Sequence, residues 1–396
     1  MVSFPSIQWL ARAPLGDNAL QSVLISALRG LAALQVAASH LRAEIYPGLR
    51  TLEDPSLAYL GLAFLTGFAH QAVVVFFLIS GWLVGGSLMN RMGKPQAIAN
   101  YAIDRFTRLW TVLLPTFVLT LAIGLVIGAA VPGPMDFDPA NEFSAASFVG
   151  NLLGLQTMTV PYYGGNYPLW SLAHETWYYI QFPLLLLVIA GGGALRRAAA
   201  AAALVLLLVT LRDMIALYFA LWLLGAVFSR VRIDCGSVCR GVLLLLTLAL
   251  FVYYRLTGIN DDLVPGSFMQ DIICSVPFLL FLATLQQQVD TASPTYVRIN
   301  RIAVFFSEFS FSLYVLHIPV IDLIRYAGRQ FLGRDRLDPY VATDFLWYFA
   351  VLGTVVVASY VFYLLFERHT IRIRNALKSL LLTPSAKPVR VALSPD

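Results

Sequence analysis

Charged residues are scarce in this chain of 396 residues. Asp, Glu, Lys and Arg together make up 12% of it, well below the ~25% of an ordinary soluble domain. Hydrophobic residues make up 59%, which is more apolar surface than one soluble core of this length can bury. The composition therefore excludes a water-soluble globular protein and predicts an integral membrane protein.

Cysteine is almost absent, with three residues in the whole chain. Cys235 and Cys239 are four positions apart, but no histidine or further cysteine is near them in the sequence, and Cys274 falls in an apolar run. This pattern excludes a disulfide framework. We predict no metal site and no permanently bound cofactor.

Apolar runs close to the ~20 residues that a bilayer requires recur along the chain. We predict an all-α integral membrane protein, a bundle of about ten transmembrane helices without an internal repeat. Residues 57–67 are apolar but too short to cross, and we interpret them as a re-entrant or interfacial segment. The predicted spans are 23–41, 70–89, 109–130, 168–189, 198–211, 213–229, 241–256, 268–285, 302–325 and 345–366.

Basic residues are unevenly divided between the two sides of this bundle. With the N-terminus inside, nineteen of the 27 basic residues fall on the inner side and eight on the outer side. The long outer loop 131–167 has neither Lys nor Arg. The bias predicts cytoplasmic termini. It also accounts for the net charge of +5, so no nucleic-acid partner is predicted.

The predicted spans and the charge pattern divide the chain into three parts. Residues 1–22 lack the pattern of a cleavable signal and are predicted to be a cytoplasmic or interfacial lead-in. Residues 23–368 form the transmembrane domain. Residues 369–396 are predicted to be a basic cytoplasmic tail, partly disordered.

Arg29 and His40 stand eleven positions apart in an otherwise apolar run. Eleven helical steps return to within about 20° of the starting direction, so both residues share one helix face, roughly 16 Å apart. Ionisable groups inside a membrane are costly unless they are partnered or hydrated. We favour an internal polar path. The alternative is that both side chains reach to the headgroups as anchors.

Arg105 and Arg108 are neighbours on one helix face at a predicted cytoplasmic end. Two adjacent guanidinium groups suit a phosphate or carboxylate ligand. Binding to lipid headgroups is an equal alternative.

His174 and Glu175 lie in the outer third of span 168–189, at a depth that suits contact with His40. An interfacial aromatic belt explains Trp170 and its aromatic neighbours, but it does not explain a buried glutamate.

Tyr314 and His317 share one face of span 302–325. They either line the polar path or cross-link helices through hydrogen bonds. In span 70–89, Ser80 precedes Gly81, and Gly81 and Gly85 suit close helix packing.

In chain order these segments resemble the acyltransferase 3 family of bacterial membrane O-acyltransferases. Ser26 departs from the aspartate that the family often has three residues before the first arginine, and His174 departs from a small or apolar residue. The similar motifs are Arg29 with His40, the "FFxxSG" segment at 75–81, Arg105 with Arg108 before Pro115, the "PLWSLxxE" segment at 168–175, the "SYxLYLxH" segment at 309–319, and the closing segment at 366–368.

The resemblance implies an enzyme of the bacterial inner membrane. It would move an acyl group, most often acetyl from acetyl-coenzyme A, to a hydroxyl of a carbohydrate such as an exopolysaccharide or another envelope glycan. The expected partners are acyl-coenzyme A, a carbohydrate or glycolipid acceptor, and membrane lipids. Acetyl-coenzyme A would be a substrate rather than a bound cofactor.

The chemistry requires a base that takes the proton of the acceptor hydroxyl, which accelerates such a reaction by ~10²–10⁴. We expect His40 to be this base, with Glu175 as its orienting partner or as a second acid or base. Arg29, Arg105 and Arg108 are expected to bind the donor. The residues expected to line the pathway or the acceptor site are Ser80, Trp170, Ser171, His174, Tyr314 and His317.

A transporter or flippase for a lipid-linked sugar is the alternative function. It too needs charged groups that face a polar cavity. Such proteins usually carry repeat symmetry, and none is visible in the sequence.

Overall fold

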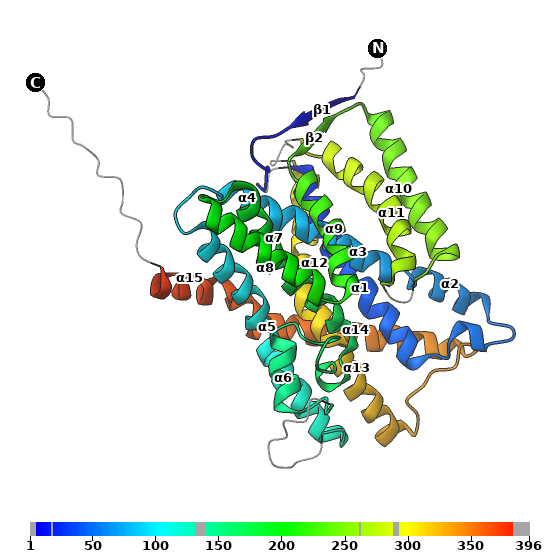
Figure 1. The fold of residues 1–396 in the computed structure, drawn as a ribbon. Coiled ribbons are helices and arrows are strands. Elements are labelled where there is room, and N and C mark those ends of the chain that lie inside the picture. The colour runs from blue at the N-terminus through cyan, green and yellow to red at the C-terminus, as the bar shows by residue number, and fades with distance from the viewer. Residues whose placement is uncertain (1–4, 17–18, 131–139, 261–262, 288–292, 383–396) are drawn as a thin grey trace, which may run out of the picture.

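The computed structural model describes residues 5–16, 19–130, 140–260, 263–287 and 293–382 (Figure 1). They form a helical bundle with one two-stranded sheet. The first half contains β1 Ser6–Trp9, α1 Leu20–Ile45, η1 Leu49–Thr51, α2 Leu57–Leu65, α3 Ala69–Ser80, the π-helix η2 Gly81–Gly85, α4 Gly86–Arg91, α5 Ala97–Ile127, α6 Ala145–Leu152, η3 Tyr163–Gly165, η4 Tyr167–Leu169 and α7 Trp170–Ala190. The second half contains α8 Ala194–Thr210, α9 Asp213–Phe228, β2 Val231–Asp234, α10 Ser237–Thr257, α11 Pro265–Thr284, α12 Pro294–Glu308, α13 Ser310–Leu332, α14 Ala342–Leu365, η5 Glu367–His369 and α15 Thr370–Leu381.

The structure confirms a protein that is almost entirely helical, with apolar helices that suit a membrane. Within the described residues, six helical segments are long and apolar enough to cross a membrane, or seven if the bent pair α12–α13 is one span. Each predicted span falls on one helix or on consecutive helices. However, α8 and α9 have only 17 and 16 residues, which is shorter than the ~20 that a crossing requires. The total of ten spans therefore stays a prediction.

The predicted span 302–325 is two helices rather than one. α12 ends at Glu308, α13 begins at Ser310, and their axes differ by 47°. The Ser310 hydroxyl donates to the carbonyl of Ser307 at 2.8 Å. The Ser310 side chain thus supplies a hydrogen bond to a backbone carbonyl at the break, where the regular helical hydrogen bonds are interrupted.

Residues 57–67 contain the nine-residue helix α2. Its first turn is capped by Ser56, whose hydroxyl accepts from the backbone N–H of Tyr59 at 3.3 Å. The same hydroxyl donates to the carbonyl of Pro339 at 2.7 Å. α2 is therefore fixed to the loop between α13 and α14 by its capping residue.

Part of the N-terminal lead-in forms a strand that the sequence does not signal. β1 pairs antiparallel with β2, with Ser6 opposite Asp234 and Trp9 opposite Val231. The predicted disorder of the tail concerns 383–396, which lie outside the described residues, whereas α15 occupies the first part of that tail.

Polar contacts sort the connecting segments into two opposite sets. We call the first set the terminal face, because segments near both ends of the described chain belong to it. Its contacts join Ala13 with Asn90, Gln286 with Val231, and Lys378 with Asp104. The second set joins Arg42 with Thr66, Ser56 with Pro339, and Arg255 with Ala63. That the terminal face is cytoplasmic stays a prediction from the basic residues.

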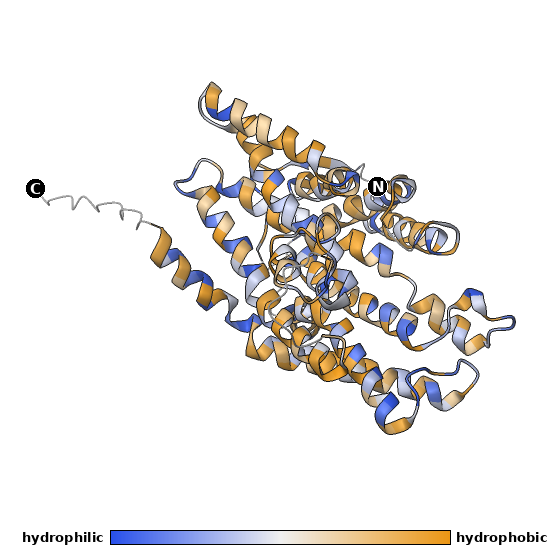
Figure 2. Ribbon diagram, turned by 60° about the horizontal axis from the view of Figure 1, so that its bottom comes forward, coloured by the Kyte–Doolittle hydropathy of each residue, from blue (hydrophilic) through white to orange (hydrophobic). Residues whose placement is uncertain are grey.

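Peripheral helices expose apolar side chains along their length (Figure 2). In α10, for example, Leu245 is 67% exposed and Thr247 is the one buried residue. A continuous apolar exterior is unfavourable in water but suits contact with lipid chains.

Close packing of α3 and η2 against α9 depends on glycine. A Cβ at Gly81 would lie 2.0 Å from the carbonyl oxygen of Trp222, and one at Gly225 would lie 2.1 Å from that of Leu78. The two backbones therefore touch where Ser80, the residue before the π-helix, enters the interior.

We expect Gly81→Ala and Gly225→Ala to lower stability by about 1–3 kcal/mol each, because the added methyl group meets backbone that cannot move aside. The thermal unfolding midpoint in detergent measures this. Gly353→Ala in α14 is the matched control, since nothing lies within 4 Å of its added Cβ. Equal midpoints for the three variants would contradict the close crossing.

Candidate active site

α1 carries both Arg29 and His40 in one uninterrupted helix. Their separation of eleven residues corresponds to roughly 16 Å along the axis. Both side chains are half-buried. The expected shared helix is present, and the surroundings of its two polar residues differ.

Arg29 faces a cavity of about 630 Å³. Its wall is formed by residues of α1, α3, η2, α4, α5, α7, α12, α13, α14 and the segment from η5 to α15. Arginine is the main charged residue in its wall: Arg29, Arg105, Arg108, Arg368 and Arg374 face three glutamates, Glu175, Glu308 and Glu367. The excess of positive charge suits an anionic ligand. Of the expected site residues, the cavity wall contains Arg29, Ser80, Arg105, Arg108, Ser171, Glu175 and Tyr314, but not His40, Trp170, His174 or His317.

The two neighbouring arginines of α5 are not equivalent. Arg108 donates to the carboxylate of Glu367 at 2.6 Å, and Glu367 is 3% exposed. That carboxylate also accepts from the backbone N–H and the hydroxyl of Ser312, at 3.1 and 2.6 Å. Arg108 is thus partly occupied by a structural role.

Arg105 lies over the ring of Tyr179, 5.7 Å from its centre. Among the residues that the structure describes, neither Arg105 nor Arg29 forms an ion pair with a carboxylate. These two guanidinium groups, both in the cavity wall, retain their charge for a ligand.

Glu175 does not contact His40. Its carboxylate accepts from the Ser80 hydroxyl at 2.6 Å and from the Tyr179 hydroxyl. Ser80 in turn accepts from the indole N–H of Trp222 at 3.1 Å. The expectation that Glu175 orients His40 directly is therefore not met, because this carboxylate is fixed on the cavity side by α3 and α7.

His40 is bonded to His317 instead, with its Nδ1 2.9 Å from His317 Nε2. The Nδ1 of His317 lies 3.2 Å from the carbonyl oxygen of Leu313, which can only accept. His317 therefore carries its proton on Nδ1, and its Nε2 accepts from His40 Nδ1–H. This leaves the lone pair of neutral His40 on Nε2.

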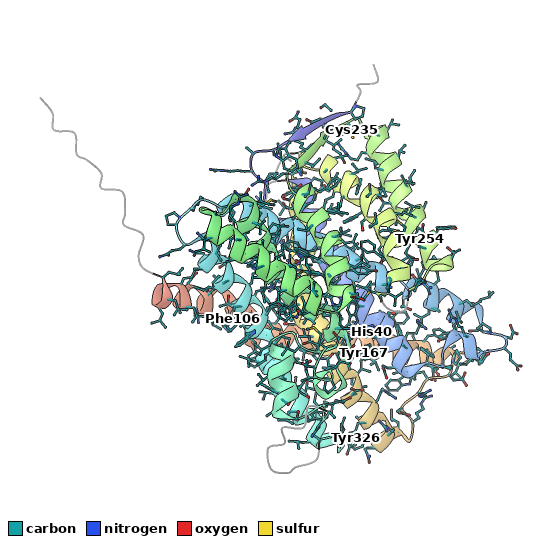
Figure 3. All side chains as sticks on the ribbon, in the orientation of Figure 1. His40, Phe106, Tyr167, Cys235, Tyr254 and Tyr326 are labelled. Carbon is teal, nitrogen blue, oxygen red and sulfur yellow. The ribbon has the colours of Figure 1, made fainter. Side chains whose placement is uncertain are left out.

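Tyr167 lies edge-on to His40, with ring centres 5.0 Å apart, as their neighbouring labels in Figure 3 indicate. Burial raises the pKa of the Tyr167 hydroxyl, and the carboxylates of Glu44 and Asp322 raise it further. Tyr167 is thus a neutral donor beside the histidine pair.

Tyr314 connects the cavity with the histidine pair. Its hydroxyl is 2.6 Å from that of Ser171 and 3.0 Å from the carbonyl oxygen of Pro168. Its ring centre lies 6.0 Å from that of His317. Two hydroxyl groups of the cavity wall, those of Ser171 and Tyr314, therefore lie close to the histidine pair.

His174 and Trp170 do not line the cavity but pack behind residues that do, such as Phe77. His174 Nδ1 donates to the carbonyl of Trp170 at 3.0 Å, and its ring is stacked on Phe77, 5.9 Å between centres. His174 Nε2 is buried without a hydrogen-bond partner in the described part of the chain.

Three residues of the site were not predicted from the sequence. Tyr179 stands four residues after Glu175, a helical spacing that could have indicated it. Glu367 was present in the closing motif without an assigned role. Nothing in the sequence pointed to Tyr167 as a neighbour of His40.

A comparison with protein families identifies the class of this protein. A model of an acyltransferase domain, that of the acyltransferase 3 family, matches residues 24–364. The chain belongs to this family. No curated protein and no solved structure matches it. The match contains every motif singled out above except the closing one at 366–368, and with the apolar helices it identifies a multi-pass membrane acyltransferase.

We expect Arg108→Ala to destabilise the protein by about 2 kcal/mol, because it leaves the buried Glu367 carboxylate without its cation. Arg105→Ala should leave stability nearly unchanged. Thermal unfolding of both variants in detergent measures the difference. Adding Glu367→Gln to Arg108→Ala should recover part of the loss, and equal losses in the two single variants would argue against a structural ion pair.

Proposed function

We propose that this membrane acyltransferase moves an acyl group, primarily acetyl, from acyl-coenzyme A to a hydroxyl of a carbohydrate in the envelope or secreted material of a bacterium. Its location would be the inner membrane. The observation that carries the proposal is the cavity with arginines at one end and Tyr314, next to the His40–His317 pair, at the other.

The charged end of the cavity suits the phosphates of a coenzyme A donor. Arg29 and Arg105 would bind anionic oxygens through charge-assisted hydrogen bonds. Apolar residues, among them Phe76 and Phe77, continue the wall towards Ser171 and Tyr314. A flexible pantetheine arm would follow this wall and bring the thioester towards the histidines.

His40 would then act as the general base. Its Nε2 takes the proton of the acceptor hydroxyl while the oxygen attacks the thioester carbonyl carbon. When the tetrahedral intermediate collapses, the C–S bond breaks, and the imidazolium returns its proton to the departing sulfur. The products are the ester and coenzyme A. His317 positions the base by accepting from Nδ1–H, which keeps Nε2 unprotonated before attack.

The direct test is an acetyl-transfer assay with radiolabelled acetyl-coenzyme A and isolated membranes that contain the protein. We expect label in the carbohydrate fraction. A lipid-linked-sugar transporter would move its cargo without new ester bonds, so transport without label incorporation would favour that alternative.

We expect His40→Ala to lower this transfer by at least ~10², the contribution of a general base. His369→Ala is the matched control, because within the described residues His369 forms no hydrogen bond or ring contact with His40 or His317. Both variants should accumulate in the membrane like the parent protein. Near-normal turnover of purified His40→Ala would remove His40 from the mechanism.

The donor and the acceptor should enter from opposite faces of the membrane. Arg105 belongs to the terminal face, where Asp104 binds Lys378, whereas His40 lies towards the other end of α1. Sealed vesicles of known orientation, with acetyl-coenzyme A on one side and acceptor on the other, test this. We expect transfer in that arrangement, and transfer only with both on the cytoplasmic side would exclude it.

A further inference from the structure

The wall of the cavity includes residues that follow the part of the chain matched by the family model. The family match ends at residue 364, whereas Arg368, Thr370, Ile371 and Arg374 all line the cavity. They belong to η5 and α15, and α15 lies beside α5 (Figure 1). The cavity is therefore completed by a segment that lies beyond the matched residues.

One buried carboxylate fixes this segment. Asp104 of α5 is 5% exposed. It binds Lys378 at 2.6 Å, Arg91 at 2.7 Å and Arg374 at 3.4 Å. Three cations around one anion leave an excess of positive charge. Because Asp104 directly precedes Arg105, one turn of α5 both holds α15 and presents an arginine to the cavity.

The charges of Arg368 and Arg374 are not fully neutralised by carboxylates of the described residues, so these arginines can bind an anionic ligand. Arg368 is exposed and forms no ion pair within the described residues. Arg374 shares Asp104 with two other cations. Both line the same cavity as Arg29 and Arg105. A ligand with several phosphate groups would meet guanidinium groups of α1 and α5 as well as those of η5 and α15. The planar guanidinium group binds phosphate oxygens with favourable geometry.

We infer that Arg368 and Arg374 form an outer phosphate site of this cavity, which binds the phosphate-bearing end of the acyl-coenzyme A donor. The inference rests on the proposed function and extends it to residues beyond the matched range 24–364. Asp104 is a positioning residue of the site, since it holds α15 against α5.

A membrane lipid has the same phosphate chemistry. α15 is amphipathic, with basic and apolar residues mixed along it, as the helix next to the C-terminus in Figure 2 shows. Basic amphipathic helices bind anionic headgroups. The position of Arg368 and Arg374 in the cavity wall favours the donor, and the experiment separates the two sources.

The test measures binding of coenzyme A by calorimetry to the full chain in phosphatidylcholine nanodiscs. We expect the double variant Arg368→Ala/Arg374→Ala to bind at least about tenfold more weakly, because two charge-assisted contacts are lost. S-acetylpantetheine, which lacks the nucleotide and its phosphates, should bind the parent and the double variant equally. Arg372→Ala is the matched control: Arg372 is an exposed arginine of the same helix that is absent from this cavity wall.

Asp104 is tested through the donor rather than through stability alone. Asp104→Asn should raise the KM for acetyl-coenzyme A about tenfold and leave kcat nearly unchanged. Asp104→Glu, which keeps the charge, should restore most of the affinity. A fall in kcat with unchanged KM would overturn the positioning role.

The outcomes distinguish this inference from the proposed function. If the parent protein binds coenzyme A and the double variant binds it equally well, the outer phosphate site is excluded while the function stands. If the double variant instead loses co-purified phosphatidylglycerol and keeps its coenzyme A affinity, the arginines bind lipid and the inference is wrong. If the parent itself binds no coenzyme A, the proposed donor fails and the site fails with it.

Discussion

The carboxylate of Glu367 joins three parts of the chain that are far apart in sequence. It binds Arg108 of α5 and the backbone and hydroxyl of Ser312 of α13, and it begins the segment that leads to α15. A carboxylate that is removed from water must be neutralised and hydrogen-bonded, or its burial is strongly unfavourable. This requirement fixes α5, α13 and η5 around the cavity, and the positions of the other arginines depend on that arrangement.

The cavity uses charge in two different ways. At Glu367 and Asp104, ion pairs are closed within the protein and hold helices together. At Arg29 and Arg105, by contrast, no ion pair with a carboxylate is formed within the described residues. Neighbouring arginines of one motif, Arg105 and Arg108, fall into different groups. A shared motif therefore does not imply a shared role.

The sequence was sufficient to predict the helical runs, the position of Arg29 and His40 on one helix, and the family. Those inferences depend on local periodicity and on residue order, which a single sequence contains. The partner of His40 could not be predicted from the sequence, because His317 lies 277 positions away along the chain. The same holds for the bond between Ser80 and Glu175, for the pairing of β1 with β2, and for the three cations at Asp104. Each depends on how distant helices pack, and no local pattern encodes that packing.

The pairing of His40 with His317 also has a consequence for biosynthesis. Membrane helices are inserted as the chain is made, and domains form in the order of synthesis. α1 is among the first elements to emerge, but its imidazole has no hydrogen-bonded neighbour to fix its proton until α13 has been added. β1 likewise cannot pair until β2 has been synthesised, because Ser6 lies opposite Asp234. The His40 imidazole thus lacks its hydrogen-bonded partner through most of translation, until one of the last helices is added.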